Sequence, residues 1–291
     1  MLIFEKNNYE QEILSLSKLH KAIFFVGIFM LILNISILIH YFKIYGIEKT
    51  IDQLKSSGAD QLIGKGTKNN EFFPNAIAMM FSQLSTFTMI SNMVLAISMI
   101  VYGLNPDKQK AQSFFFFAVV NITITFLIYW TLIFYFSLKN GTWTHLERAI
   151  PSFILHAINP AIGFILLGFA RKSITLKTYQ IWMTNIMVLS YFLYAFTMFF
   201  IADPIKELNP NLDKTVDVYT KYNIVVYKFL NFKQPLFYKG GKLGIVILLD
   251  IFMFIIGGFL TPGLAWFWKG VYRINILKLQ PKETAQEIPQ V

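Results

Sequence analysis

Few side chains within the apolar stretches of this sequence could take part in chemistry. His156 and Asp250 are ionisable residues well inside such stretches. Thr88 and Asn92 belong to a polar run in another stretch, and their spacing of four residues puts them on one helical face. A threonine hydroxyl becomes an effective nucleophile when a base takes its proton, and imidazole is suited to do so near neutral pH. These four residues form the candidate catalytic group.

Each of the four has a predicted role. Thr88 would be the nucleophile and His156 the general base. Asp250 could orient the imidazole, as the acid does in a catalytic triad. Asn92, one helical turn from Thr88, could donate a hydrogen bond to a developing oxyanion. Structural roles remain open, because polar side chains in membrane helices often join neighbouring helices, and Asp250 could pair with His156 or Asn121.

The elements that must position these side chains are apolar stretches of membrane-spanning length. The chain has 291 residues, of which 55% are hydrophobic and only 14% charged, too few to cover a soluble domain. Helices that cross a bilayer need about 20 apolar residues. The stretches of that length are 22–42, 78–103, 114–138, 149–170, 181–202 and 243–268. We therefore predict an all-α, polytopic transmembrane helical bundle of about six spans, flanked by tails 1–21 and 269–291.

Three candidate residues are expected at one depth. If both termini face the cytoplasm, the second, fourth and sixth spans all enter from the outer face. Thr88, His156 and Asp250 then lie roughly 10–16 Å below the outer boundary, at a rise of about 1.5 Å per residue. Polar groups from three spans at one level predict a common interior site.

Basic residues set the predicted orientation. On one side of a six-span bundle lie Lys6, Lys18, Lys21, Lys108, Lys110, Arg171, Lys172, Lys177, Lys269, Arg273, Lys278 and Lys282. By the positive-inside rule, that side, with both termini, is cytoplasmic, and the protein is predicted to reside in the cell membrane. Topology and anionic lipid head groups account for the net charge of +10, so we expect a lipid bilayer partner and no nucleic acid.

Several kinds of site are excluded or not indicated. The chain contains no cysteine, which excludes disulfides and thiolate chemistry. Metal-ligand spacings of His, Asp and Glu, glycine-rich phosphate loops and nucleophile-elbow motifs are absent from the sequence, so no metal or cofactor is expected. The abundance of Phe, Ile, Lys and Asn is typical of an AT-rich bacterial genome.

Two short motifs resemble a known family. Residues 87–92 read Phe-Thr-Met-Ile-Ser-Asn, which resembles the Phe-Thr-x-x-Ser-Asn signature of the bacterial Pr6Pr family. Residues 155–160 read Leu-His-Ala-Ile-Asn-Pro, similar to that family's Leu-His-x-x-x-Pro motif. These six-span proteins look distantly similar to the eukaryotic androgen-induced family, which hydrolyses fatty-acid esters of hydroxy fatty acids. The resemblance implies an intramembrane Thr and His, which fall here on Thr88 and His156.

Three hypotheses about function follow. The first is an intramembrane hydrolase of lipid esters, which predicts that Thr88 and His156 lie within hydrogen-bond reach. The second is a non-catalytic scaffold that binds partners through outer loops or through the tail 280–291, which predicts locally paired polar groups and no cavity. The third is a small transporter with Asp250 and His156 on a proton or solute path, which predicts a continuous polar passage. The sequence does not predict the oligomeric state.

Overall fold

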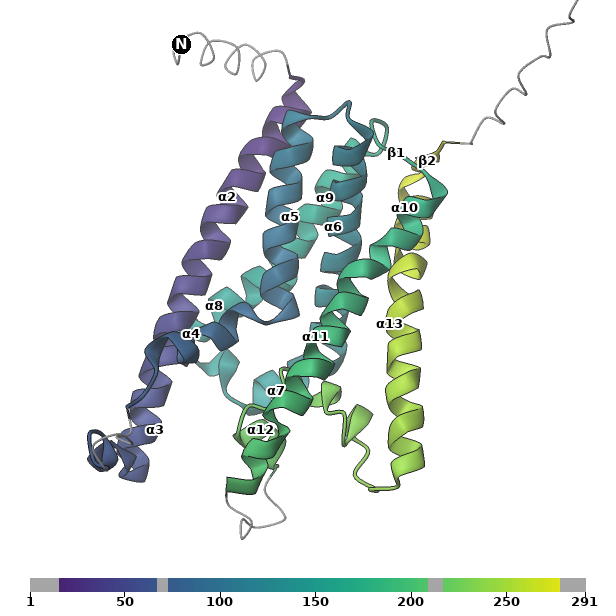
Figure 1. Cartoon of the computed structure of the whole chain (residues 1–291). Helices are drawn as coiled ribbons and strands as arrows, with labels where there is room; N and C mark the ends of the chain where they lie inside the picture. The colour runs from purple at the N-terminus through teal and green to yellow at the C-terminus, as the bar shows by residue number, and fades with distance from the viewer. Residues whose placement is uncertain (1–15, 67–72, 209–216, 278–291) are drawn as a thin grey trace, which may run out of the picture.

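The computed structural model of the chain describes residues 16–66, 73–208 and 217–277, and almost all of its regular structure is helical. Six helical segments are long and apolar enough to cross a membrane. They stand side by side as one bundle (Figure 1). The segments are Lys18–Ser57, Phe87–Leu104, Gln109–Lys139, Leu146–Ala170, Thr178–Leu208 and Leu243–Tyr272. The predicted all-α fold with six spans is therefore confirmed, and the membrane character with it.

Most spans are composed of several helical elements. The first contains α2 (Lys18–Tyr41), the π-helical η1 (Phe42–Glu48) and α3 (Lys49–Ser57), and the 3-10 turn η2 (Ala59–Leu62) follows. The third contains α6 (Gln109–Ile128), the π-helical η3 (Tyr129–Ile133) and α7 (Phe134–Lys139). After η4 (Thr142–Thr144), the fourth contains α8 (Leu146–Phe153), the π-helical η5 (Ile154–Ile158) and α9 (Asn159–Ala170). The fifth contains α10 (Thr178–Trp182), η6 (Met183–Asn185), α11 (Ile186–Ala202) and η7 (Asp203–Leu208), and the sixth is α13 (Leu243–Tyr272).

The second predicted span is broken rather than continuous. The stretch 78–103 divides into α4 (Ala76–Leu84) and α5 (Phe87–Leu104). Thr86 has an extended backbone and caps α5, since its side chain accepts a hydrogen bond from the backbone N–H of Met89. Polar residues at the junction compete with helical hydrogen bonding, which explains the break. As a result, a helix N-terminus lies inside the bundle, and Thr88 is its second residue.

The fourth span departs from α-helical geometry around His156. Pro160 has no backbone N–H, so the carbonyl of His156, four residues earlier, has no α-helical donor at that position. The indole Nε1–H of Trp130 donates to that carbonyl instead, over 2.9 Å. π-Helical turns of this kind are frequent at functional sites.

The first two spans pack in close contact through glycines. A Cβ atom on Gly103 would lie 2.7–2.8 Å from Cβ, Cα and N of Phe24, and one on Gly27 would lie 2.9 Å from the backbone nitrogen of Ile100. Small residues let helix backbones approach in a membrane, where packing replaces the hydrophobic effect as the cause of association. This contact fixes α5, the helix that carries Thr88, against α2.

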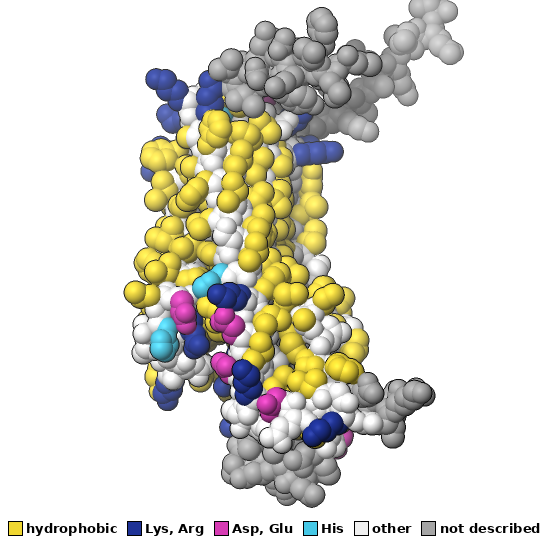
Figure 2. Space-filling view, turned by 90° about the vertical axis from the view of Figure 1, so that its left-hand side faces the viewer, with side chains coloured by type: hydrophobic (Ala, Val, Ile, Leu, Met, Phe, Trp, Pro, Cys, Tyr) yellow, Lys and Arg dark blue, Asp and Glu magenta, His cyan; other side chains and the backbone are white. Residues whose placement is uncertain are grey.

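The outer surface matches a bilayer environment. Exposed apolar side chains follow α11 and α13, including Phe200, Ile201, Leu248, Phe252 and Phe259. Figure 2 shows an apolar belt on one face, with charged residues towards the two ends of the molecule. At one end β1 (Thr175–Leu176) pairs in parallel with β2 (Asn275–Ile276), at the same end of the bundle as the beginning of α2 (Figure 1).

The connection between the fifth and sixth spans folds back against the bundle. Its described part contains α12 (Val218–Lys221), η8 (Lys228–Leu230) and η9 (Pro235–Phe237). Phe232 is 2% exposed and packs in one cluster with Phe199 of α11. Lys233 Nζ lies 2.7 Å from a carboxylate oxygen of Asp203, so an ion pair also attaches the connection to the end of α11. This arrangement brings Tyr227 to the N-terminus of α5.

Candidate functional site

Thr88 and His156 are in contact. Thr88 Oγ1 lies 3.3 Å from His156 Nε2, although the two residues are 68 positions apart in the chain. The π-helical turn holds the imidazole in the bundle, where His156 is 9% exposed. The predicted common depth therefore holds for these two side chains.

The surroundings of His156 indicate which ring nitrogen can accept a proton. Nδ1 lies 2.7 Å from the backbone carbonyl oxygen of Ser152. A carbonyl oxygen only accepts hydrogen bonds, so the Nδ1–H donates there and Nε2 of the neutral ring carries the lone pair. The hydroxyl of Thr88 can then donate to Nε2, which is the geometry of a nucleophile and its base.

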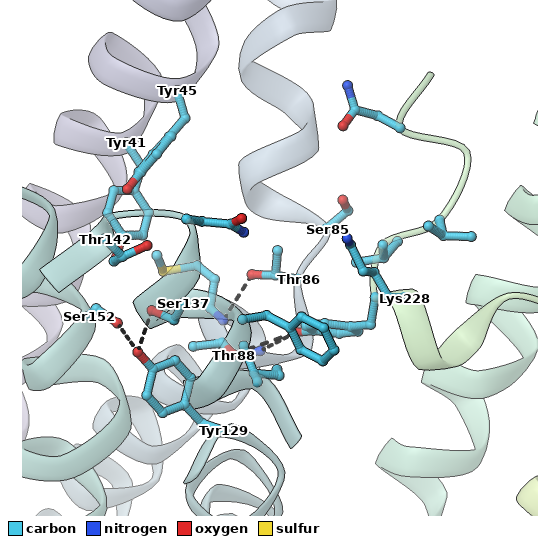
Figure 3. A pocket seen from close by; sticks show the side chains of 18 of the residues that line it. Tyr41, Tyr45, Ser85, Thr86, Thr88, Tyr129, Ser137, Thr142, Ser152 and Lys228 are labelled. Carbon is cyan, nitrogen blue, oxygen red and sulfur yellow. Dashed lines mark hydrogen bonds between the residues drawn. The ribbon is translucent and has the colours of Figure 1, made fainter. Parts of the chain in front are cut away.

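Tyr129 supports the imidazole from one face. The two rings are stacked with centroids 3.6 Å apart and planes inclined by 15°. The Tyr129 hydroxyl lies 2.8 Å from Ser152 Oγ and 3.2 Å from Ser137 Oγ, as the dashed lines in Figure 3 indicate. Tyr129 lies in the π-helical turn η3, so two irregular turns from neighbouring spans meet at the site.

Tyr227 approaches Thr88 from the folded-back connection between the fifth and sixth spans. Its hydroxyl oxygen accepts the backbone N–H of Thr88 over 3.3 Å and lies 3.5 Å from Thr88 Oγ1. Burial raises the pKa of Tyr227 above its usual value of 10. Tyr227 therefore keeps its proton at neutral pH and can act as a donor beside the candidate nucleophile.

A cavity with a mixed wall of polar and apolar side chains opens at this site, and we call it the polar cavity. It has a volume of about 750 Å³, and Thr88, His156 and Tyr227 all belong to its wall. Figure 3 shows Thr88, Tyr129 and Ser152 on one side of it and Lys228 near Ser85 on another. Other polar side chains in the wall are Tyr41, Tyr45, Lys49, Thr50, Gln53, Thr86, Ser137, Asn140, Thr142 and Asn223.

An apolar cavity of about 240 Å³ adjoins the same residues. Its wall comes from the second, third, fifth and sixth spans and from the folded-back connection. Thr88 and Tyr227 line both cavities. The candidate nucleophile therefore stands where a polar space meets an apolar one.

Asn92 has no free N–H group for the role predicted for it, which is to donate a hydrogen bond to an oxyanion. Its amide nitrogen donates to the backbone carbonyls of Thr88 (2.8 Å) and Leu155 (3.1 Å), which uses both N–H groups. The prediction that Asn92 donates to an oxyanion is therefore wrong. By binding both carbonyls, Asn92 instead joins the helix of Thr88 to the turn that carries His156.

Three buried asparagines form a network behind the site. Asn159 Nδ2 donates to Asn34 Oδ1 over 2.8 Å and to Asn92 Oδ1 over 2.7 Å. Asn34 Nδ2 donates in turn to the carbonyl of Asn92 over 3.0 Å. All three side chains are fully buried, and they come from the first, second and fourth spans.

Asp250 does not orient His156. The Nδ1–H of His156 is taken by the carbonyl of Ser152, so the predicted triad arrangement is wrong. Asp250 Oδ1 is buried with no hydrogen-bond partner among the described residues, and Asp250 lines neither cavity. Asn121, its other predicted partner, donates to the carbonyls of Phe117 and Thr184 instead.

Sequence reasoning missed Tyr129, Ser152, Tyr227 and Asn34. Tyr129 lies in an apolar stretch without a motif, and Tyr227 lies in an irregular connection with no motif. The part of the chain that the structure describes holds no group of three or more His, Asp or Glu that could bind a metal ion.

The chain matches no protein-family model, curated protein or solved structure. The resemblance to the Pr6Pr family therefore stays a prediction from two motifs.

Proposed function

We propose that this membrane protein is an intramembrane hydrolase of lipid esters, with Thr88 as nucleophile and His156 as general base. The observation that carries the proposal is the 3.3 Å contact between Thr88 Oγ1 and His156 Nε2 in the wall of a cavity. The hydrogen bond from Nδ1 to Ser152 favours the tautomer that such a base needs.

In the first half of the reaction, His156 Nε2 takes the hydroxyl proton as Thr88 Oγ1 attacks the ester carbonyl carbon. The carbonyl electron pair moves to its oxygen. That oxyanion would be stabilised by the Tyr227 hydroxyl and by the positive end of α5, where Thr88 is the second residue. When the carbonyl re-forms, the alcohol oxygen leaves with the proton from Nε2, and an acyl ester of Thr88 remains.

In the second half, His156 takes a proton from water, and the water oxygen attacks the acyl carbonyl. The intermediate collapses, Thr88 Oγ1 leaves with the proton from His156, and a carboxylic acid is released. The sum is one ester and one water converted to one acid and one alcohol. The protein's own groups suffice, so the proposal invokes no cofactor.

The proposed location follows from the same spans and basic residues. The protein would lie in a bacterial cell membrane with both termini in the cytoplasm and the cavities near the outer face. Substrate would reach the site from the surrounding lipid bilayer. No nucleic-acid partner is proposed.

The test is ester hydrolysis by purified protein in detergent or liposomes. Thr88→Ala and His156→Ala should each lower kcat/KM by 10³-fold or more, as for other nucleophile and base removals (roughly 10³–10⁶). The matched control is Thr131→Ala, since Thr131 is exposed and its hydroxyl bonds only to Leu127 of its own helix. Mass spectrometry should find an acyl group on Thr88 after quenching. Unchanged hydrolysis in Thr88→Ala would remove the assignment.

The alternatives make different predictions. The scaffold hypothesis predicts no cavity, whereas two cavities adjoin Thr88. Its candidate binding tail, 280–291, lies outside the described residues. The transporter hypothesis puts Asp250 and His156 on one polar path, whereas Asp250 lines neither of the two cavities.

A further inference from the structure

We infer that the substrate is a single-chain ester with a compact anionic head group, its acyl chain in the apolar cavity and its head group in the polar cavity. This inference rests on the proposed hydrolase function and adds the substrate class. It follows from the walls of the two cavities and from the position of Thr88 between them.

The apolar cavity suits a hydrocarbon chain. Its wall consists mainly of side chains such as Ile124, Val188, Met253, Ile256 and Leu260. Ligand sites with apolar walls and few polar groups bind the apolar parts of their ligands.

Apart from those of Thr88 and Tyr227, the hydroxyl groups in that wall are already engaged. Thr125 Oγ1 lies 2.6 Å from Ser91 Oγ, and the Tyr191 hydroxyl donates to the Ser85 carbonyl over 2.9 Å. A polar ligand group would find few partners there and would lose its hydration, so a chain of methylene groups is favoured.

The polar cavity suits an anion. Lys49 and Lys228 belong to its wall, and none of the described lining residues is acidic. The nearby Glu48 faces a different cation, because its carboxylate lies 3.6 Å from Lys43 Nζ. Amide and hydroxyl groups of Gln53, Asn140 and Thr142 could donate hydrogen bonds to a phosphate or carboxylate in place of water.

The position of Thr88 fixes the orientation of the ester. Since Thr88 lines both cavities, a carbonyl carbon at Thr88 Oγ1 has one cavity on each side. The acyl chain then extends into the apolar side and the leaving alcohol into the polar side. Hydrolysis releases a fatty acid and an anionic alcohol. A second acyl chain would have to occupy the polar cavity, so diacyl lipids should be poor substrates.

Gly257 and Gly258 offer a matched pair for the chain site. Gly257 lines the apolar cavity, whereas Gly258 does not. A Cβ atom would lie 3.4 Å from Val188 at Gly257 and 3.7 Å from Leu189 at Gly258, so both positions accept a Cβ atom at van der Waals distance. Gly257→Leu should lower the kcat/KM ratio of long-chain over short-chain esters roughly tenfold or more. Gly258→Leu should leave the ratio unchanged. Equal ratios in wild type and Gly257→Leu would overturn the assignment of the chain site.

Chain binding can be measured without catalysis. A fatty acid with a photoreactive group in mid-chain should cross-link to residues of the apolar cavity, such as Met253 or Leu260, in the wild type and in Thr88→Ala. Cross-linking in a wild-type protein that hydrolyses none of the esters would refute the hydrolase and keep the chain site. Hydrolysis without cross-linking in this cavity would refute the chain site and keep the hydrolase.

The head-group site has its own test. Monoacylglycerol phosphate and a monoacyl ester with a carboxylate on its alcohol are compared with uncharged monoacylglycerol of the same chain, and with diacylglycerol phosphate. We expect a preference of about tenfold or more for at least one anionic monoacyl ester, and the two anions distinguish phosphate from carboxylate. The double variant Lys49→Gln with Lys228→Gln should abolish the preference. Lys139→Gln, a basic residue outside the cavity wall, should retain it. Preference for uncharged or diacyl substrates would contradict the inference.

Discussion

Tyr129 and His156 lie face to face, with ring centroids 3.6 Å apart, although they belong to different spans. Each residue lies in a π-helical turn, and the Tyr129 hydroxyl also contacts Ser152, whose carbonyl accepts the Nδ1–H of His156. The imidazole is therefore fixed both in its plane and across it. A base fixed in this way needs little reorganisation when it takes a proton.

The contributions of the Tyr129 ring and hydroxyl can be separated. Tyr129→Phe keeps the stacked ring and loses one hydroxyl, so kcat/KM should fall by less than about tenfold, the equivalent of one hydrogen bond. Tyr129→Leu also removes the stacked ring, and kcat/KM should fall about tenfold further. Steady-state kinetics on ester substrates measures both. A larger loss in Tyr129→Phe than in Tyr129→Leu would contradict a supporting role of the ring.

Tyr227 should stabilise the oxyanion. Tyr227→Phe removes the hydroxyl beside Thr88, and we expect kcat to fall about 10²–10³-fold with KM little changed. Circular dichroism and melting curves should show that the fold is retained. A change confined to KM would assign Tyr227 to binding alone.

The pH profile provides a second test of Tyr227. Burial disfavours the phenolate and so raises the pKa of Tyr227 above its usual value of 10. The donor form is the protonated one, and it is lost only as pH rises through that raised pKa. Ionisation of Tyr227 should therefore cause no fall in wild-type kcat up to pH 10. A fall in kcat centred below pH 10 in the wild type, absent in Tyr227→Phe, would contradict this.

The asparagine network should contribute to stability. Asn159→Leu removes two buried hydrogen bonds and leaves the acceptor oxygens of Asn34 and Asn92 without this donor. We expect a loss of about 1–3 kcal/mol, measured by thermal or denaturant unfolding in detergent. Asn105→Leu is the control, because Asn105 Nδ2 bonds only to Val101 in its own helix. Equal effects of the two substitutions would show that the network adds nothing.

Asp250 should be dispensable for hydrolysis. Asp250→Leu removes a buried polar oxygen that has no partner among the described residues. Since carboxylates are costly at membrane depth, stability should stay the same or rise by up to about 3 kcal/mol. Ester turnover should be unchanged. Loss of turnover with an intact fold would return Asp250 to the mechanism.

The number of spans and the contact between Thr88 and His156 could be predicted from the sequence, because apolar length and position along a span are local signals. Apolar length determined the spans, and counting residues from the outer boundary put Thr88 and His156 at one level. The same counting included Asp250, since depth along a helix axis carries no information about which face of the helix points inward. The packing of α13 against α11 and α6 decides that face, and packing is not visible in one sequence.

The irregular backbone was also beyond sequence reasoning. Stretch 78–103 is apolar enough to read as one helix, yet Thr86 caps a new helix inside it. Asn92 was assigned from its spacing to Thr88, which placed it on the correct face. Its amide hydrogens are nevertheless used by the carbonyls of Thr88 and Leu155, and the second of these belongs to another span. Tyr227 reaches the site only because a long connection folds back through tertiary contacts.

The network of Asn34, Asn92 and Asn159 also has a consequence for biogenesis. Helices leave the ribosome in chain order, so the first two spans are in the membrane before the fourth is synthesised. Until then, the side-chain oxygens of Asn34 and Asn92 lack their donor from Asn159. An unpaired amide in lipid is costly, so the first two spans carry polar groups that stay unsatisfied until the fourth span arrives. Arrival of the fourth span pairs these groups and brings His156 beside Thr88 in the same event, which ties completion of the fold to completion of the site.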